Sequence, residues 1–388
     1  MKRLPFFLSM QSCPRRCVYC HQGEITGTFN IPSPEHVEAA AASATEPVEI
    51  CFFGGSFTCI PHDRQKAYLE GALKAPRGST VRLSTHPECL SSAVLALLAR
   101  YPVSMIELGI SSLDDHVLTL CNRGYSGTEV LSAVERVLDA GFHAGAQMMI
   151  GLPGQSERSS FEDLLRLDAA RKGRPLTLRI YPCLVLRDTP LEELYRRGDY
   201  VPLHLDAAAL WSGRLLVLAR DLGIPVQRVG LQESATLSRS VVTGPHHPAF
   251  GELARAAELA LTLAAGSLPK QWRVPGRARS LLTGHGQYGL RLLAGMTGLS
   301  QEETARRVVF CAESGEKPEH PDTRRITEEY LNPQAAGSVT GERLGGGCRL
   351  SSLTTAQAII SAPCVRRLPA CETDIRVGFS PPGALPRG

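Results

Sequence analysis

The stretch that organises this chain starts with Leu4-Pro-Phe-Phe-Leu-Ser-Met10 and continues, after two further residues, as Cys13-Pro-Arg-Arg-Cys17-Val-Tyr-Cys20. The apolar run predicts a strand, and the three cysteines follow it at a three-then-two spacing. A four-iron four-sulfur (4Fe-4S) cluster is usually held by four thiolates. Three thiolates on one loop would bind three of the irons and leave the fourth open to another ligand. We therefore interpret Cys13, Cys17 and Cys20 as cluster ligands.

Zinc is the main alternative for these cysteines. A structural zinc site normally takes four ligands from two knuckles, and the sequence has no second pair of cysteines separated by two residues. His21 could be a fourth ligand, but adjacent Cys20 and His21 cannot easily both face one tetrahedral ion. The spacing favours an iron–sulfur cluster over zinc, and over three unrelated buried thiols.

The composition narrows the class of protein. The 388 residues suffice for one large domain with an appendage or for two domains, and a hydrophobic fraction of 43% permits a sizeable core. The net charge of +4 allows an RNA partner without arguing for one. The N-terminus lacks the pattern of a signal peptide, and no apolar stretch reaches the roughly 18 residues of a membrane span. We expect a cytoplasmic protein with no membrane partner, whose free thiols favour metal over disulfides.

Strand-like apolar runs alternate with amphipathic helical runs as far as about residue 185. The expected strands are Pro5–Met10, Val48–Phe53, Val81–Thr85, Met105–Ser111, Phe142–Ile150 and Leu176–Val185, and the expected helices lie near 34–45, 62–75, 88–100, 114–122, 127–140 and 158–172. The fifth helix is the clearest, because Ser126 and Glu129 form a capping-box pattern and Gly141 would end it. Beyond it, helices are expected at Leu191–Arg197, Leu203–Leu222 and Phe250–Ala264, with a strand-like run at Ile224–Val229.

Six strand–helix units predict a parallel α/β sheet with right-handed crossovers. Because a closed barrel needs eight units, we expect a partial (β/α)6 barrel, with its chemistry at the carboxyl ends of the strands. The predicted organisation is a partial barrel over 1–190, a small α/β C-terminal extension over 191–311, and a low-order tail over 312–388 that is rich in Pro, Gly, Ser and Thr.

The Cys-x3-Cys-x2-Cys motif, with aromatic Tyr19 before the last cysteine, resembles the signature of the radical S-adenosylmethionine (SAM) superfamily. The resemblance implies a radical-SAM-type partial barrel that holds a 4Fe-4S cluster and SAM. The open iron would chelate the amino and carboxylate groups of SAM. One electron, from a donor such as ferredoxin or flavodoxin, would then cleave SAM to methionine and a 5′-deoxyadenosyl radical. Tyr19 would lie against the cluster or its ligand.

The ends of the later strands carry motifs that agree with this resemblance. Gly54 and Gly55 follow the second strand, where two glycines let a backbone approach a ligand closely, and they are similar to the motif that receives the amino group of SAM. Arg123 matches the arginine of the family that pairs with the carboxylate of SAM. Weaker contacts are expected from residues that depart from the family's usual types: Ser84 in place of a ribose-binding Glu, Ser111 in place of Gln, and Gln147 in place of Asp.

Three longer motifs indicate a branch of the superfamily. Phe52–Thr58, Leu178–Leu186 and His247–Leu253 resemble the elongator catalytic-subunit family, whose members modify the wobble uridine of tRNA with a radical domain and an acetyltransferase domain. The resemblance covers roughly residues 1–295, and nothing after 295 resembles an acetyltransferase. By position in this pattern, the polar residues expected on the substrate side are Tyr181, Arg187, Arg228, Gln232, His246 and His247.

The expected function is that of a radical SAM enzyme acting on an RNA, specifically tRNA, as a candidate tRNA-modifying transferase. No catalytic residue is assigned beyond the cluster. Two alternatives stay open: the same chemistry on a small metabolite, and a non-catalytic iron–sulfur protein that binds RNA or serves in assembly. The basic stretch 270–295 could contact phosphates or could be a solvated face.

The remaining cysteines have no ligand-like spacing. Those in or beside regular elements are predicted to be small core residues: Cys51, Cys59, Cys89, Cys121 and Cys183. A second metal site is not favoured at the others, which are Cys311, Cys348, Cys364 and Cys371.

Overall fold

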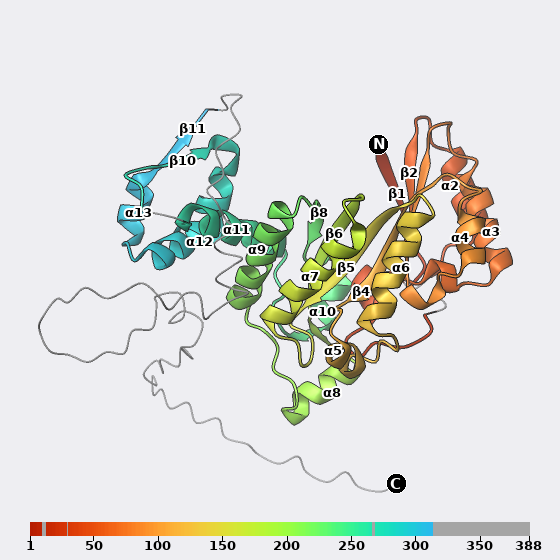
Figure 1. Ribbon diagram of the computed structural model, residues 1–388, viewed down its shortest axis with the longest axis horizontal. Helices are drawn as coiled ribbons and strands as arrows, with labels where there is room; N and C mark the ends of the chain where they lie inside the picture. The colour runs from red at the N-terminus through yellow and green to blue at the C-terminus, as the bar shows by residue number, and fades with distance from the viewer. Residues whose placement is uncertain (10–12, 29, 266–267, 313–388) are drawn as a thin grey trace, which may run out of the picture. The chain divides into compact units, whose positions relative to one another are not determined.

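The computed structural model describes residues 1–9, 13–28, 30–265 and 268–312, so the predictions for the tail, including that a second metal site is not favoured there, fall almost wholly outside the described residues. Its main feature is a parallel sheet of seven strands in the order β1-β2-β3-β4-β5-β6-β8 (Figure 1). The strands are β1 (Lys2–Phe7), β2 (Val48–Phe53), β3 (Thr80–Thr85), β4 (Val103–Ser111), β5 (His143–Ile150), β6 (Leu176–Pro182) and β8 (Val226–Val229).

Helices connect successive strands, as the sequence predicts. They are α2 (Pro34–Ala42), α3 (His62–Ala72), α4 (Ser92–Leu98), α5 (Asp115–Leu120), α6 (Gly127–Asp139), α7 (Glu157–Arg171) and α9 (Leu205–Asp221). In α6 the predicted capping box of Ser126 and Glu129 is present, and Gly141, with φ of +86°, follows its end. The partial α/β barrel is therefore confirmed.

The sheet differs from the expected one in its number of strands and in several strand boundaries. β8, which falls within the predicted extension 191–311, is a seventh strand paired with β6. β6 ends at Pro182 instead of Val185, because proline has no amide hydrogen to continue the ladder. The next residues form β7 (Val185–Leu186), which pairs antiparallel with β9 (Val241–Thr243). The first strand starts at Lys2 instead of Pro5, in register with β2.

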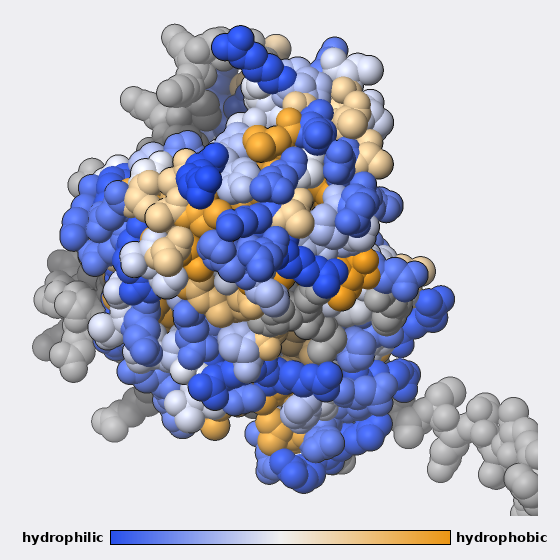
Figure 2. Space-filling view, turned by 90° about the vertical axis from the view of Figure 1, so that its right-hand side faces the viewer, coloured by the Kyte–Doolittle hydropathy of each residue, from blue (hydrophilic) through white to orange (hydrophobic). Residues whose placement is uncertain are grey.

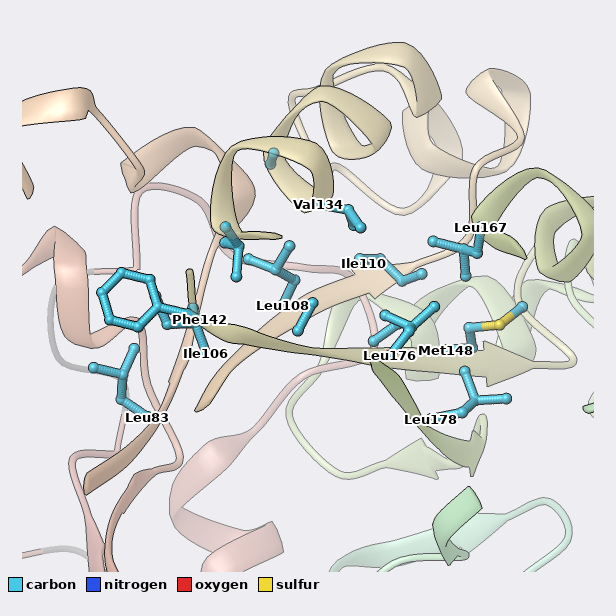
Figure 3. Packing of buried hydrophobic residues seen from close by; sticks show 14 of the residues in the cluster. Leu83, Ile106, Leu108, Ile110, Val134, Phe142, Met148, Leu167, Leu176 and Leu178 are labelled. Atoms are coloured by element: carbon cyan, nitrogen blue, oxygen red, sulfur yellow. The ribbon is translucent and has the colours of Figure 1, made fainter. Parts of the chain in front are cut away.

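The two faces of the sheet have opposite polarity, because side chains alternate along each strand. On one face Ile106, Leu108 and Ile110 of β4 pack beneath Val134 of α6 and Leu167 of α7 (Figure 3). The alternate residues on the other face are polar, and five strands contribute Glu49, Arg82, Glu107, Gln147 and Arg179. The polar face is the inner one.

A single hydrogen bond shows that the sheet curls. Arg82 Nη1 on β3 donates to Gln227 Oε1 on β8 at 2.5 Å, although three strands lie between them in the sheet. Four strand spacings in a flat sheet would separate them by roughly 19 Å. Only a curved sheet, whose inner side chains meet across the hollow, allows this contact.

The other elements cover the rim and extend the chain. They are α1 (Gln22–Thr26), η1 (Phe57–Cys59), η2 (Pro87–Cys89), α8 (Pro190–Arg197), α10 (Ala235–Ser240), α11 (Phe250–Ala264), β10 (Trp272–Pro275), η3 (Gly276–Ala278), α12 (Arg279–Thr297), α13 (Gln301–Arg307) and β11 (Val308–Cys311). Gly213 lets α11 approach α9, since an added Cβ would lie 2.7 Å from Ala257 Cβ. The face in Figure 2 is mostly hydrophilic, with smaller apolar patches. Within the described ranges, no helix is long and apolar enough to span a membrane.

Two of the predicted core thiols are bonded to each other. Cys59, at the end of η1, and Cys89, at the end of η2, form a disulfide with a Cα–Cα distance of 5.2 Å. The prediction of free thiols is wrong for this pair, because the turns after neighbouring strands β2 and β3 bring them within bonding range. Cys51, Cys121 and Cys183 are free and buried, as predicted.

Candidate functional site

The three-cysteine loop lies directly after β1, at the carboxyl edge of the sheet. Cys17 is buried, Cys20 is half-buried and Cys13 is exposed. A tight turn closes the loop, with the Cys20 amide donating to the Cys17 carbonyl at 3.1 Å. Val18 ties the loop to the rest of the protein, because its amide donates to Cys121 O after α5 and its carbonyl accepts from Leu191 N in α8. The thiols thus sit on an anchored loop.

Arg123 reaches this loop from the turn after α5. Its Nη1 donates to Cys17 Sγ at 2.7 Å, its Nε donates to the Tyr125 hydroxyl at 2.7 Å, and its Nη2 donates to the carbonyl of Gly109. The guanidinium is buried and lies over the Tyr125 ring, with 5.0 Å between Cζ and the centroid. The structure therefore brings Arg123 beside a predicted cluster ligand; its pairing with a cofactor carboxylate stays a prediction.

The glycine turn lies near Cys13, the first cysteine of the loop. Gly54 follows β2 with φ of +79°, a left-handed conformation that favours glycine. An added Cβ would meet Thr26, Phe7 and Ser9 at 3.4–3.5 Å, so the turn is closely packed. The next polar side chain, Ser56, has its hydroxyl 3.5 Å from Cys13 Sγ. The predicted cluster ligand Cys13 and the predicted glycine motif are therefore neighbours.

Tyr19 and Ser111 meet each other. The Tyr19 hydroxyl lies 2.6 Å from Ser111 Oγ, and both side chains are buried. Ser111 has φ of +61°, and the register between β4 and β5 is irregular between Leu108 and Ser111. The end of β4 is thus shaped around a tyrosine from the cysteine loop.

Ser84 and Gln147 form a second group, deeper in the hollow. Gln147 Nε2 donates to Ser84 Oγ at 3.1 Å and to Glu107 Oε2 at 2.8 Å. Ser111 lies four residues, or roughly 13 Å, further along β4 than Glu107. The strand register shifts between them, so that Ser111 is paired with Met148, the residue after Gln147 on β5. No hydrogen bond joins the two groups within the described residues, and a cofactor role for Ser84 and Gln147 stays a prediction.

The donor set fits an iron–sulfur cluster better than a single ion. Among the described residues, no three His, Cys, Asp or Glu side chains converge on a point that one metal ion could occupy. Cluster cysteines instead bind different irons and need not converge. Burial, together with the neighbouring Cys17 and Cys13 thiols, raises the pKa of the Cys20 thiol to about 12. A thiol of this kind loses its proton near pH 7 when a strong positive charge lies beside it, and a metal cluster supplies that charge.

His86 is a buried neighbour of Arg123 for which we predicted no role. Its ring packs edge-on against Tyr125, with 4.8 Å between ring centroids. Burial lowers the pKa of His86 to about 3, and the charges of Arg123 and Arg15 act in the same direction. The imidazole is therefore neutral near pH 7 and adds no second cation beside Arg123.

No hydrogen bond joins the residues expected on the substrate side to one another within the part of the chain that the structure describes. Tyr181 lies beside Arg179, His246 Nε2 is 3.0 Å from Glu233 Oε2, and His247 Nδ1 accepts from the Ala249 amide. Arg228 donates to the Gly230 carbonyl. Each of these has a local partner that accounts for it, so their substrate role stays a prediction.

Several residues of the site were not predicted. Ser56 and Tyr125 hold Cys13 and Arg123 through contacts between segments far apart in the chain, for which a single sequence has no signal. Glu107, Arg82 and Arg179 did have a signal, because each interrupts an apolar strand with a charge.

Asp163 on α7 holds the loop after β4 and should make the stability of the fold depend on pH. Its Oδ2 accepts from the Ser112 hydroxyl at 2.6 Å and from the Leu113 amide at 2.9 Å. Burial raises the pKa of Asp163 to about 6, above its unfolded value of about 3.9. Between about pH 4 and pH 6 the folded state therefore binds more protons than the unfolded state. The stabilisation that protonated Asp163 contributes is lost as the pH rises through 6.

Asp163→Asn should flatten that loss of stability. We expect the wild type to lose at most about 3 kcal/mol of unfolding free energy between about pH 4 and pH 7 through this group. The loss is measured as a fall of the urea midpoint. The variant keeps an acceptor oxygen but cannot titrate, so its decline should be smaller. If the urea midpoints of the two proteins fall in parallel with pH, Asp163 does not control the loss of stability.

Comparison with known proteins identifies the class. Residues 7–167 match the Radical SAM superfamily, and residues 175–260 match the radical SAM C-terminal domain. Together with the curled parallel sheet, these matches show that the chain belongs to the radical SAM superfamily, a superfamily of enzymes. They confirm the superfamily that the cysteine motif predicts.

Within the superfamily the chain is similar to elongator protein 3 (Elp3). It is 26% identical over 184 residues to the tRNA uridine(34) acetyltransferase of Methanocaldococcus infernus, covering 42% of this chain and 34% of that protein. It is 25% identical over 219 residues to Elongator complex protein 3 of Homo sapiens, covering 49% and 40%. The chain thus spans about a third to a half of the curated relatives it matches. A solved structure of M. infernus Elp3 lacking residues 1–46 shares the fold, with a TM-score of 0.50, 20% identity, and coverage of 66% of this chain and 61% of that one.

Proposed function

We propose that this protein binds a 4Fe-4S cluster through Cys13, Cys17 and Cys20, binds SAM beside it, and modifies a base of an RNA, specifically tRNA. The observation that carries the proposal is the contact of Arg123 with Cys17, beside a glycine turn that reaches Cys13 through Ser56. When bound, the cluster and SAM would supply one-electron cleavage of SAM to a 5′-deoxyadenosyl radical. The electron would come from a ferredoxin or flavodoxin.

The chain's own residues would bind and orient SAM and shield the cluster from water. Arg123 is a buried cation whose guanidinium is held by Tyr125 and Gly109, and it favours anionic sulfur beside it. Gly54 and Gly55 would offer backbone groups to the amino end of SAM. Tyr19, with its hydroxyl on Ser111, would cover the buried side of the cluster and exclude water. Ser84 and Gln147 would contact the ribose.

The experiment that tests the chemistry is release of 5′-deoxyadenosine. Anaerobically reconstituted protein, given SAM and dithionite, should release 5′-deoxyadenosine and methionine in equal amounts. Protein reconstituted without iron is the control and should release neither. An intact cluster that releases no 5′-deoxyadenosine would leave the alternative of a non-catalytic iron–sulfur protein.

A basic lobe supports an RNA substrate. The lobe, residues 268–312, carries seven Lys or Arg and two Glu, a balance of +5 in a chain whose net charge is +4. Three of the cations, Lys270, Arg306 and Arg307, line a surface pocket of about 380 Å³ together with Glu303. Clustered cations of this kind bind nucleic-acid phosphates with a strong salt dependence. The proposed role of the lobe is to hold the RNA backbone.

Lys270→Gln/Arg306→Gln should weaken binding of bulk tRNA. Each lost phosphate contact is expected to reduce the slope of log K against log salt by about 1, and filter binding at several salt concentrations measures it. Lys74→Gln/Arg158→Gln removes two exposed cations outside the lobe and should leave the slope unchanged. Equal loss in both variants would mean that the lobe is an ordinary solvated surface, and failure of tRNA to bind or to stimulate 5′-deoxyadenosine release would favour a small metabolite.

A further inference from the structure

Glu107 is a buried carboxylate at the centre of the inner face of the sheet, with an exposed fraction of 1%. Arg82 Nη1 and Arg179 Nη2 donate to its Oε1 at 3.0 and 2.9 Å. Its Oε2 accepts from Gln147 Nε2 at 2.8 Å and lies 2.8 Å from Arg179 Nε. Both carboxylate oxygens are therefore surrounded by donors.

The charges around Glu107 balance locally. Arg82 also binds Glu49, with 2.9 Å between Nη2 and Oε1. Two guanidiniums and two carboxylates thus compensate one another inside the hollow. The network does not need a ligand's charge to balance its own, and Gln147 is the uncharged side chain that contacts Glu107 directly.

The backbone makes room for this arrangement. Glu107 on β4 is paired in register with Gly145 on β5. A Cβ on Gly145 would lie 2.8 Å from Glu107 Cγ, closer than side chains pack. Because Gly145 has no side chain, Glu107 can lie across β5 and reach Gln147, two residues further along that strand.

The contact with Glu107 decides which way the Gln147 amide points. A carboxylate only accepts hydrogen bonds, so the group facing it must be the NH₂ of Gln147. That NH₂ has two hydrogens, and the second is directed at Ser84 Oγ at 3.1 Å. The carbonyl oxygen Oε1 is the remaining polar atom, and it can only accept. Gln147 therefore offers an acceptor, and not a donor, to whatever it contacts.

We propose that Glu107 is a positioning residue that holds the Gln147 carbonyl oxygen ready to accept a hydrogen bond from a ribose hydroxyl of SAM. The inference rests on the proposed function, in which Gln147 contacts the cofactor. It adds a direction to that contact: the ribose must donate. A ligand with an acceptor of the same size in place of the hydroxyl should be rejected.

Fluorinated cofactors test the direction of this hydrogen bond. The probes are SAM and its 2′-deoxy-2′-fluoro and 3′-deoxy-3′-fluoro analogues, bound to anaerobically reconstituted protein without reductant and measured by equilibrium dialysis. Fluorine is close to a hydroxyl in size but cannot donate. For the hydroxyl that meets Gln147, the wild type should bind the fluoro analogue about tenfold more weakly than SAM, the scale of one lost hydrogen bond.

Glu107→Gln should reduce that ratio to about twofold or less. Its own NH₂ would face Gln147, whose amide would then turn and direct its NH₂ toward the ribose, where fluorine is tolerated. Glu258→Gln removes a carboxylate that pairs with Arg220 on α9, outside this network, and should keep the tenfold ratio. If the single variant does not fold, Glu107→Gln/Arg179→Met preserves the charge balance and gives the same test.

Gln147→Ala separates this inference from the proposed function. If Gln147→Ala abolishes the tenfold ratio while Glu107→Gln retains it, the positioning role of Glu107 is overturned and the ribose contact stands. If Gln147→Ala retains the ratio, or the wild type shows none at either position, the ribose contact itself is wrong and the inference fails with it.

Discussion

Replacing Cys17 by alanine is expected to abolish the brown chromophore of anaerobically reconstituted protein. Of the three cysteines, Cys17 is the buried one, and its sulfur is the one that accepts from Arg123. Its removal would take away a ligand and leave a buried guanidinium without its anionic partner. Because only two of the three proposed cysteine ligands would remain, cluster binding should fall below detection.

Cys311→Ala is the matched control for this prediction. Cys311 ends β11 in the basic lobe and is free and partly exposed, so its loss should leave the visible absorbance and the iron content unchanged. Iron and sulfide analysis should show near-full loading for the control and near-zero loading for Cys17→Ala. Persistent colour in Cys17→Ala would mean that the ligand assignment is wrong.

Arg82→Met is expected to cost about 3–5 kcal/mol of unfolding free energy, the range for breaking a buried ion pair by removing one partner. Arg82 is 5% exposed and contacts Glu49 on β2, Glu107 on β4 and Gln227 on β8. Without it, buried Glu107 would keep only Arg179 as a cationic partner, and partly buried Glu49 would keep only Arg3. The hydrogen bond that spans the curled sheet would also be lost.

Arg3→Met provides a control with the same chemical change on the same partner. Arg3 Nε donates to Glu49 Oε2 at 2.8 Å, but the Arg3 side chain is 56% exposed. An exposed pair contributes less than about 1 kcal/mol. Urea unfolding of the two metal-free variants should therefore give a large shift of the midpoint for Arg82 and a small one for Arg3. Similar small shifts would show that the inner network is not needed for the fold.

Much of the fold was predictable because it depends on local patterns. The strand–helix alternation, the capping box before α6 and the position of the cysteines after β1 all depend on neighbouring residues. The seventh strand was harder to place, because β8 follows a long helical connection and only its pairing with β6 includes it in the sheet. The Cys59–Cys89 disulfide had no signal either, since it joins turns 30 residues apart.

The sequence by itself determined the class of protein. Cys-x3-Cys-x2-Cys is a local motif whose spacing decides which thiols share one loop, and the glycine turn and Arg123 follow strands that the pattern identifies. Only the tertiary structure decided how these parts meet. Arg123 finds Cys17 across 106 residues, and Glu107 is buried between two arginines and Gln147 because the sheet curls. Such contacts depend on curvature and on the absence of a side chain at Gly145, and these are properties of the folded chain that no local pattern encodes.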